Sequence, residues 1–225
     1  MTGLLLNWRR RLRLRRLGDC PLRDYLATPF PRPGLDYRDA RYVAVDLETT
    51  GLDARRDQIL SIGWVLVDGN RIRLGSARHR LLRVAGAIPA DSAVIHQITD
   101  DEAARGLELS AALPELLADL AGRVLIAHHA RVELGFLGRA CKRLWGKGLL
   151  VRAIDTQAVA RRLLERRQIP FKASDLRLHA LCERYNLPRH GAHNALSDAL
   201  SAAELFLAQA AHRDSGRGMA LGDFL

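Results

Sequence analysis

The chain has little cysteine: three residues, Cys20, Cys141 and Cys182, stand far apart in 225. No Cys-x-x-Cys pair is present, which argues against a disulfide framework and against a structural zinc site. Isolated thiols in odd number fit a reducing compartment, so we expect a cytoplasmic protein. The sequence also lacks an apolar run of about 18 residues, which excludes a membrane-spanning helix on length.

The N-terminal segment has little of what a targeting signal needs. A secretory signal places basic residues before its apolar stretch, whereas here the leucines at positions 4–6 precede the arginines at 9–16. Serine is absent from residues 1–40, which disfavours an organelle transit peptide. Two interpretations stay open for this segment: an amphipathic helix that packs its leucines on the domain, or a cationic arm that touches nucleic acid or anionic lipid.

Positive charge is what the chain has in excess. Thirty-five Lys and Arg against 25 Asp and Glu give a net charge of +10. Residues 1–40 hold nine Arg and four Asp, so the excess is shared between this segment and the rest of the chain. Such a surface favours polyanionic partners such as nucleic acid or anionic lipid. A merely solvated Arg-rich surface is the plainer alternative.

The pattern of prolines and apolar residues divides the chain into three parts. Four prolines and Gly34 fall within residues 21–40, which disfavours a continuous helix or a central strand. We therefore expect an Arg-rich extension and Pro-rich linker over residues 1–40. A single domain over residues 41–212 and a C-terminal tail over residues 213–225 would follow.

The domain is expected to have an α/β fold. A β-branched run at 42–47 and two runs flanking a turn at 68–70 predict three antiparallel strands. Strands and helices then alternate, which predicts a mixed five-stranded sheet with parallel strands after the first three and helices on both faces. The later elements are expected at these ranges: helix 109–120, strand 123–127, helix 131–145, strand 151–154, and helices 155–166, 176–185 and 194–212.

Two carboxylates stand where a sheet would bury them. Asp46 and Glu48 are two residues apart on a predicted strand, so both side chains leave the same face. Buried together they would repel each other, and a divalent cation would offset that repulsion. Oxygen ligands suit Mg²⁺ or Mn²⁺. An exposed acidic strand end is the alternative.

Two predicted helices also carry a carboxylate on a face that is otherwise expected to pack against the domain. Glu133 falls on the apolar stripe of helix 131–145, where a carboxylate needs a metal or an arginine partner. Asp198 shares its face of the last helix with small apolar residues. His193 could reach the same site if Asn194 caps that helix and leaves the histidine on the preceding loop.

The motifs occur in the order found in a known family. Residues 45–52 resemble the first motif of the DEDDh exonucleases, the RNase H-like group that contains the proofreading epsilon subunit of bacterial DNA polymerase III. Residues 95–99 are similar to its His-Gly-Ile-Thr segment, and residues 127–133 resemble its second motif. Residues 154–156 match its Ile-Asp-Thr, and residues 193–199 resemble its third motif. The match covers roughly residues 41–210, and the ordered set is specific where any one motif is weak.

The resemblance implies a 3′→5′ exonuclease that hydrolyses phosphodiesters with two Mg²⁺ or Mn²⁺ ions. Asp46 would bridge both ions, Glu48 and Asp198 would complete one site, and Glu133 would support the other. His193 would be the general base, a role that suits its ordinary pKa of about 6.5. The substrate-binding positions would be Thr49, His96 and His128.

Two departures from the family pattern bear on rate and metal preference. His129 replaces the usual Asn, and Glu133, one methylene longer, replaces the usual Asp. We expect single-stranded DNA as the substrate and a polymerase or another replication or repair protein as a partner in trans. Two alternatives remain: an RNA-trimming relative such as oligoribonuclease or RNase T, and a catalytically weakened nucleic-acid-binding protein.

Overall fold

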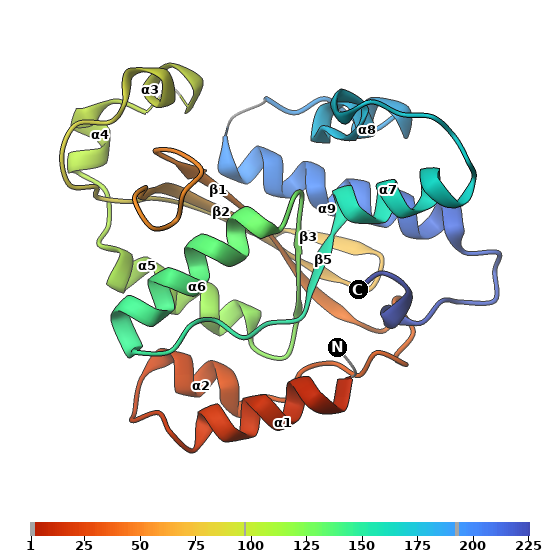
Figure 1. The fold of residues 1–225 in the computed structure, drawn as a ribbon, viewed down its shortest axis with the longest axis horizontal. Helices are drawn as coiled ribbons and strands as arrows, with labels where there is room; N and C mark the ends of the chain where they lie inside the picture. The colour runs from red at the N-terminus through yellow and green to blue at the C-terminus, as the bar shows by residue number, and fades with distance from the viewer. Residues whose placement is uncertain (1–2, 97, 192–193) are drawn as a thin grey trace.

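A computed structural model describes residues 3–96, 98–191 and 194–225 (Figure 1). The strands have these bounds: β1 Arg41–Thr49, β2 Ile59–Asp68, β3 Arg71–Leu81, β4 Val124–Ala127 and β5 Ala153–Asp155. The helices have these bounds: α1 Gly3–Leu14, α2 Pro21–Ala27, α3 Ala90–His96, α4 Asp100–Ala104, α5 Leu109–Leu120, α6 Arg131–Trp145, α7 Thr156–Arg166, α8 Leu178–Arg184 and α9 Ala195–Arg213. Two short 3₁₀ turns, η1 and η2, cover Ala173–Leu176 and Leu221–Asp223.

The five strands form one sheet in the order β3-β2-β1-β4-β5. Strand β1 pairs antiparallel with β2, which pairs antiparallel with β3. On its other edge β1 pairs parallel with β4, which pairs parallel with β5. This confirms the predicted mixed sheet. Strand β1 is central, so the side chains at its C-terminal end lie in the middle of the molecule.

Helices cover both faces of the sheet, as predicted. On one face, Val43 and Val45 pack with the apolar stripes of α5 and α6. On the other, Tyr42 and Ala44 pack with α7 and α9, where Phe206 lies 5.0 Å from the Tyr42 ring. Because side chains alternate along a strand, Asp46 and Glu48 continue the row that faces α9.

The N-terminal segment packs on the domain instead of extending from it. Helix α1 buries Leu6 in the same core as α5 and α6, and α2 adds Leu22 and Leu26. Arg10, only 5 % exposed, donates hydrogen bonds to the carbonyl oxygens of Leu26 and Ala27 at the end of α2. The segment expected to be a Pro-rich linker thus contains a short helix. Pro21 occupies its first turn, where the missing N–H is not needed.

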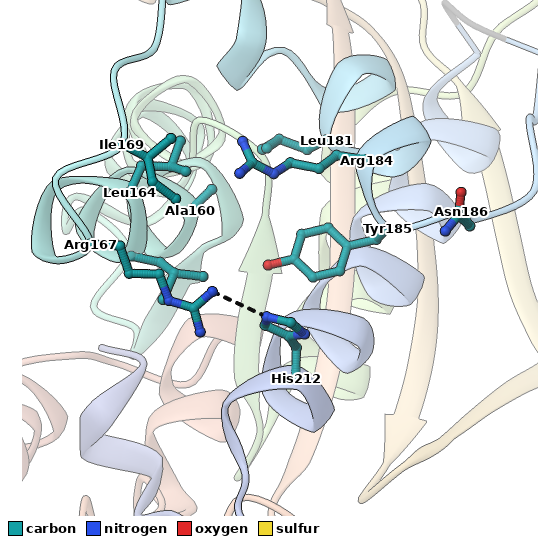
Figure 2. A pocket seen from close by; sticks show the side chains of 10 residues that line it. Ala160, Leu164, Arg167, Ile169, Leu181, Arg184, Tyr185, Asn186 and His212 are labelled. Carbon is teal, nitrogen blue, oxygen red and sulfur yellow. Dashed lines mark hydrogen bonds between the residues drawn. The ribbon is translucent and has the colours of Figure 1, made fainter.

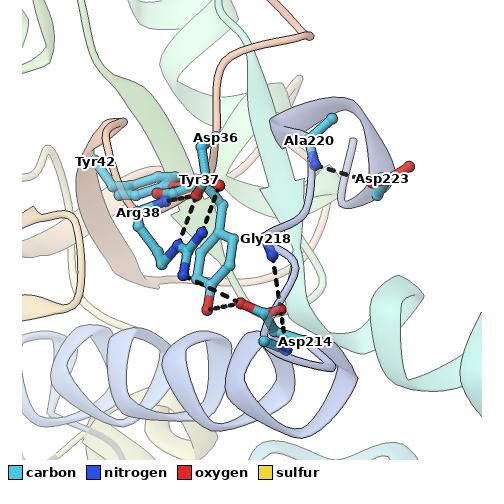
Figure 3. Close-up of polar contacts among 9 residues, drawn as sticks. Asp36, Tyr37, Arg38, Tyr42, Asp214, Gly218, Ala220 and Asp223 are labelled. Atoms are coloured by element: carbon cyan, nitrogen blue, oxygen red, sulfur yellow. Dashed lines mark hydrogen bonds and ion pairs between the residues drawn. The ribbon is translucent and has the colours of Figure 1, made fainter.

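The C-terminal tail folds back along the chain (Figure 3). Asp36 and Ala220 form an isolated β-bridge, and Asp214 accepts hydrogen bonds from the Tyr37 hydroxyl and the Gly218 N–H. Phe224 is fully buried, 5.5 Å from the Tyr37 ring. No helix in the part of the chain that the structure describes is long and apolar enough to cross a bilayer.

Candidate active site

Strand β1 and helix α9 come together at the end of β1. Asp46 pairs with Gly63 of β2, and a Cβ placed on Gly63 would lie 2.2 Å from the backbone of Ala195 and Leu196. The start of α9 therefore rests directly on the backbone of β2. Glycine at this position permits the contact, because any side chain would occupy the space of the helix.

Asn194 fixes where α9 begins. Its side-chain oxygen accepts hydrogen bonds from the N–H groups of Leu196 and Ser197, as an N-cap residue does. Asp198 then follows in the first turn and points to the end of β1. The cap predicted from the sequence is confirmed, and it places the carboxylate of the last motif beside those of the first.

Three carboxylates converge at this point. Asp46, Glu48 and Asp198 each offer an oxygen, and these oxygens all lie within 4.8 Å of one another. Burial raises the pKa of Asp46 well above its ordinary value, and the negative charges of Glu133, Glu48 and Asp198 raise it further. The Asp46 carboxyl group therefore resists ionisation in the absence of a cation.

Glu133 lies next to this group without joining it. It is 3 % exposed in the first turn of α6, and the three-carboxylate cluster does not include it. Burial raises the pKa of Glu133 to about 8, and Asp155 and Glu48 add to the rise. Neither Arg131 nor Arg139 forms an ion pair with it among the described residues.

The donor set fits a hard divalent cation. Glu48 is 5 % exposed, and its Oε1 has no hydrogen-bond partner among the described residues. The same holds for Oε2 of Glu133. Buried carboxylate oxygens left without donors are costly, and a cation bound by oxygen ligands would satisfy them.

Two of the predicted substrate-binding residues, His96 and Thr49, lie beside Glu48. Nδ1 of His96, at the end of α3, lies 2.5 Å from Oε2 of Glu48. Thr49 follows Glu48 and donates its hydroxyl to the carbonyl of Gly51 at 2.7 Å. His193, the predicted general base, lies outside the described residues.

His128 has its ring held from both sides. Nδ1 lies 2.9 Å from the Thr156 hydroxyl and Nε2 lies 2.9 Å from the Leu176 carbonyl oxygen. Burial lowers the pKa of His128 to about 4, so the ring is neutral near pH 7. A contact of this side chain with substrate would use the ring face or edge carbons.

Asp155 organises the neighbouring turn. Its carboxylate accepts hydrogen bonds from the N–H groups of Gln157 and Ala158 at the start of α7, and from those of His129 and Ala130 before α6. In the sequence, residues 154–156 stand out only by their resemblance to the family's Ile-Asp-Thr, which indicates neither pair of hydrogen bonds. His129 has φ +60°, a left-handed conformation that His tolerates better than most residues.

Comparisons with known proteins identify the family. A family model described as exonuclease, RNase T, matches residues 43–206. The chain belongs to this exonuclease family. Its enzyme class is that of the 3′→5′ exonucleases, as the sequence motifs predicted.

Curated relatives agree with this assignment. DNA polymerase III subunit epsilon of Treponema pallidum is 32 % identical over 177 residues, covering 79 % of this exonuclease and 80 % of that protein. DNA polymerase III PolC-type of Thermotoga maritima is 32 % identical over 171 residues, covering 76 % of this chain. The chain spans only 12 % of that much longer protein.

Solved structures share the fold. E. coli exonuclease I in complex with a 5cy-dT13 oligonucleotide superposes with a TM-score of 0.66 at 14 % identity, covering 78 % of this exonuclease and 41 % of that chain. Exonuclease X in complex with 5′ overhanging duplex DNA gives a TM-score of 0.60 at 22 % identity, and the match covers 81 % of this chain and 99 % of that chain. These likenesses confirm the RNase H-like fold.

The site could be anticipated in part from the sequence. The first and third motifs do supply Asp46, Glu48 and Asp198 to one cluster. Gly63 was missed, although a glycine inside a predicted strand signals a close backbone approach. Ser92, which donates its hydroxyl to the carbonyl of Thr49 at 2.9 Å, carried no such signal.

Proposed function

We propose that this exonuclease removes nucleotides one at a time from the 3′ end of single-stranded DNA, with Mg²⁺ or Mn²⁺ as its cofactor. One observation carries the proposal: the carboxylate oxygens of Asp46, Glu48 and Asp198 lie within 4.8 Å of one another, and Oε1 of the buried Glu48 has no donor among the described residues. The carboxylates of such a cluster repel one another strongly unless a cation binds between them. A protein that only binds nucleic acid has no need of such a cluster.

Four carboxylates would hold two divalent ions. Asp46, Glu48 and Asp198 would share one ion, and Glu133 would support the second with Asp46. When bound, such ions supply positive charge that stabilises the charge developing on the phosphate in the transition state. The extra methylene of Glu133 sets its oxygens differently from those of the aspartate usual in the family, so metal preference is expected to depend on this residue.

The chain's own side chains would orient substrate and move the proton. An imidazole nitrogen of His193, the residue before the cap Asn194, would take the proton from the attacking water. His96 holds one oxygen of Glu48 and so fixes the direction of the other. Thr49, which follows Glu48 on β1, and His128 would contact the terminal nucleotide.

DNA is favoured over RNA by the relatives, which are named for DNA polymerase III. The stretch that is similar to this chain is a small part of the PolC-type DNA polymerase III. We therefore propose a role in replication proofreading or repair together with a polymerase supplied in trans. The three cysteines are free, in keeping with the reducing cytoplasm proposed as its location.

Strand-end analysis tests the proposal. Single-stranded DNA and RNA of one sequence, labelled at either end, would be incubated with the protein in Mg²⁺, Mn²⁺ or EDTA. We expect metal-dependent loss of the 3′ label and a ladder anchored at the 5′ label, both abolished in Asp46→Asn and His193→Ala. Asp101→Asn, which removes an exposed carboxylate on α4, is the matched control and should cleave normally.

Each other outcome is informative. Faster degradation of RNA than of DNA would mean that RNA is the substrate. Cleavage only after Glu133→Asp would mean that the natural chain has a weakened metal site. Binding of DNA without cleavage in any metal or variant would contradict the proposed enzyme.

A further inference from the structure

A second cavity lies away from the carboxylates, between α7, α8 and the C-terminal part of α9 (Figure 2). Its volume is about 430 Å³, within the range of small-ligand pockets. His212 on α9 lines it, fourteen residues after Asp198. At 1.5 Å per residue the two positions are about 21 Å apart along the helix. None of the four proposed metal ligands lines this cavity.

Positive side chains converge on the cavity. Nη1 of Arg167 lies 3.5 Å from Nε2 of His212, and Figure 2 shows Arg184 directed into the same space from α8. Burial raises the pKa of the Tyr185 phenol, and the nearby Arg184 and Arg167 oppose that rise. Both arginines therefore act on the same hydroxyl from different elements.

No carboxylate inside the cavity balances these charges; Asp175, whose pKa the Arg184 charge helps to lower, is not among the lining residues. The residues that line the cavity include no Asp or Glu. Neither Arg167 nor Arg184 forms an ion pair with a carboxylate in the described part of the chain. Two guanidinium groups beside a histidine, open to solvent and with no carboxylate in the cavity lining, form a site for an anion. Their planar forks suit the paired oxygens of a phosphate.

Apolar side chains line most of the rest of the cavity and form its apolar wall. Leu164 and Leu181 are buried, and Ile169 extends the surface beside them. The Tyr185 ring stands between this wall and His212, with which it makes an edge-on contact at 5.9 Å. A free inorganic ion would leave this wall unused. An anion that carries a flat aromatic group would fill both parts of the cavity.

We propose that this cavity binds a nucleoside monophosphate unit. The phosphate lies against Arg167, Arg184 and His212, and the base lies on the apolar wall beside Tyr185. The unit is either a free nucleotide, the product of the reaction, or one nucleotide of a strand whose 3′ end is in the active site. The choice of a nucleotide rests on the proposed exonuclease function, whereas the anion site itself does not.

Binding is measured without catalysis, so that a failure of the proposed activity does not affect the result. The full chain in EDTA would be titrated with dAMP, inorganic phosphate and adenosine by equilibrium dialysis. Oligo-dT of increasing length would be titrated by fluorescence anisotropy. The variants are Arg184→Ala and Arg184→Lys. Arg161→Ala, an exposed arginine of α7 outside the cavity, is the matched control for net charge.

We expect dAMP to bind more tightly than phosphate or adenosine, and Arg184→Ala to weaken this binding about ten-fold. Arg184→Lys should restore part of it, and Arg161→Ala should change little. A weakening that appears for dAMP alone identifies a product site. One that appears for long but not short oligo-dT identifies a strand site. Equal affinities of Arg184→Ala and Arg161→Ala for every ligand, or phosphate binding as tightly as dAMP, would overturn the proposal.

Discussion

Replacing Gly63 with alanine should damage the active site without touching any of its side chains. The new Cβ would lie 2.2 Å from backbone atoms of Ala195 and Leu196, whereas ordinary contact begins at 3.4 Å. The start of α9 must therefore move by about 1 Å, because strand β2 is fixed between its neighbours. Asp198 is in the first turn of α9 and moves with it, away from Asp46 and Glu48.

Two magnitudes follow from this displacement. Overpacking of this kind costs about 1–3 kcal/mol of stability. A misplacement of about 1 Å in a catalytic group lowers the rate by about 100-fold. We therefore expect Gly63→Ala to stay folded, to lose about two orders of magnitude in exonuclease kcat/KM, and to bind Mn²⁺ more weakly.

Controls separate geometry from stability. Gly75→Ala makes the same substitution on β3, where nothing lies within 4 Å of the added Cβ, and should leave cleavage and Mn²⁺ affinity unchanged. Thermal unfolding, single-turnover cleavage and Mn²⁺ titration would be measured for both variants. Near-normal activity of folded Gly63→Ala would refute the view that this contact positions Asp198.

Three further predictions concern the buried groups. In EDTA the folded protein holds a proton on Glu133 up to a pKa of about 8, against an ordinary value of 4.5. Because the folded state then binds more protons than the unfolded state, the free energy of unfolding should fall as pH rises from about 5 to 8. Mn²⁺ or Glu133→Gln should reduce that fall, and a Tm that does not vary with pH in EDTA would contradict the assignment. Phe224→Ala should lower stability by about 3–5 kcal/mol while leaving kcat per folded molecule unchanged, because the fully buried ring packs on the rings of Tyr37 and Phe206. Chemical denaturation, with activity measured at saturating metal, tests this, and a loss of activity alone would contradict it. Glu133→Asp should shift the ratio of Mn²⁺- to Mg²⁺-supported rates, and an unchanged ratio would remove Glu133 from the metal site.

Long elements with a strong period were predictable from the sequence. The structure places α5 at Leu109–Leu120 and α6 at Arg131–Trp145, the ranges predicted from apolar spacing. The hairpin strands agree within a residue or so, since a turn marked by Asp68-Gly69 fixes their register. Hydrophobic periodicity specifies these elements locally, so little tertiary information is needed.

Short elements were not predictable in the same way. The segment before α5 contains α3 and α4, which are seven and five residues long and too short to show a period. Thr99 and Glu102 do form a capping box at α4, a spacing that was readable in the sequence. Helix α2 was obscured by the prolines around it, although Pro21 in fact begins it.

Site geometry needed the fold as well as the motifs. Because side chains alternate along β1, Asp46 and Glu48 lie on one face of the strand. The Asn194 cap fixes where α9 begins and so the direction in which Asp198 points. The separation of Glu133 from the three-carboxylate group could not be read from the sequence, because it depends on how α6 approaches β1. The second pair of hydrogen bonds to Asp155 likewise depends on a turn distant in the chain.

Calorimetric titration with Mn²⁺ tests the central claim most directly, since it measures the cation site apart from any substrate. Wild-type protein should bind the ion, Asp198→Asn should bind it at least ten-fold more weakly, and the exposed control Asp101→Asn should match the wild type. Equal Mn²⁺ affinity in all three proteins, or no binding by the wild type, would contradict the account of Asp46, Glu48 and Asp198 as a metal centre.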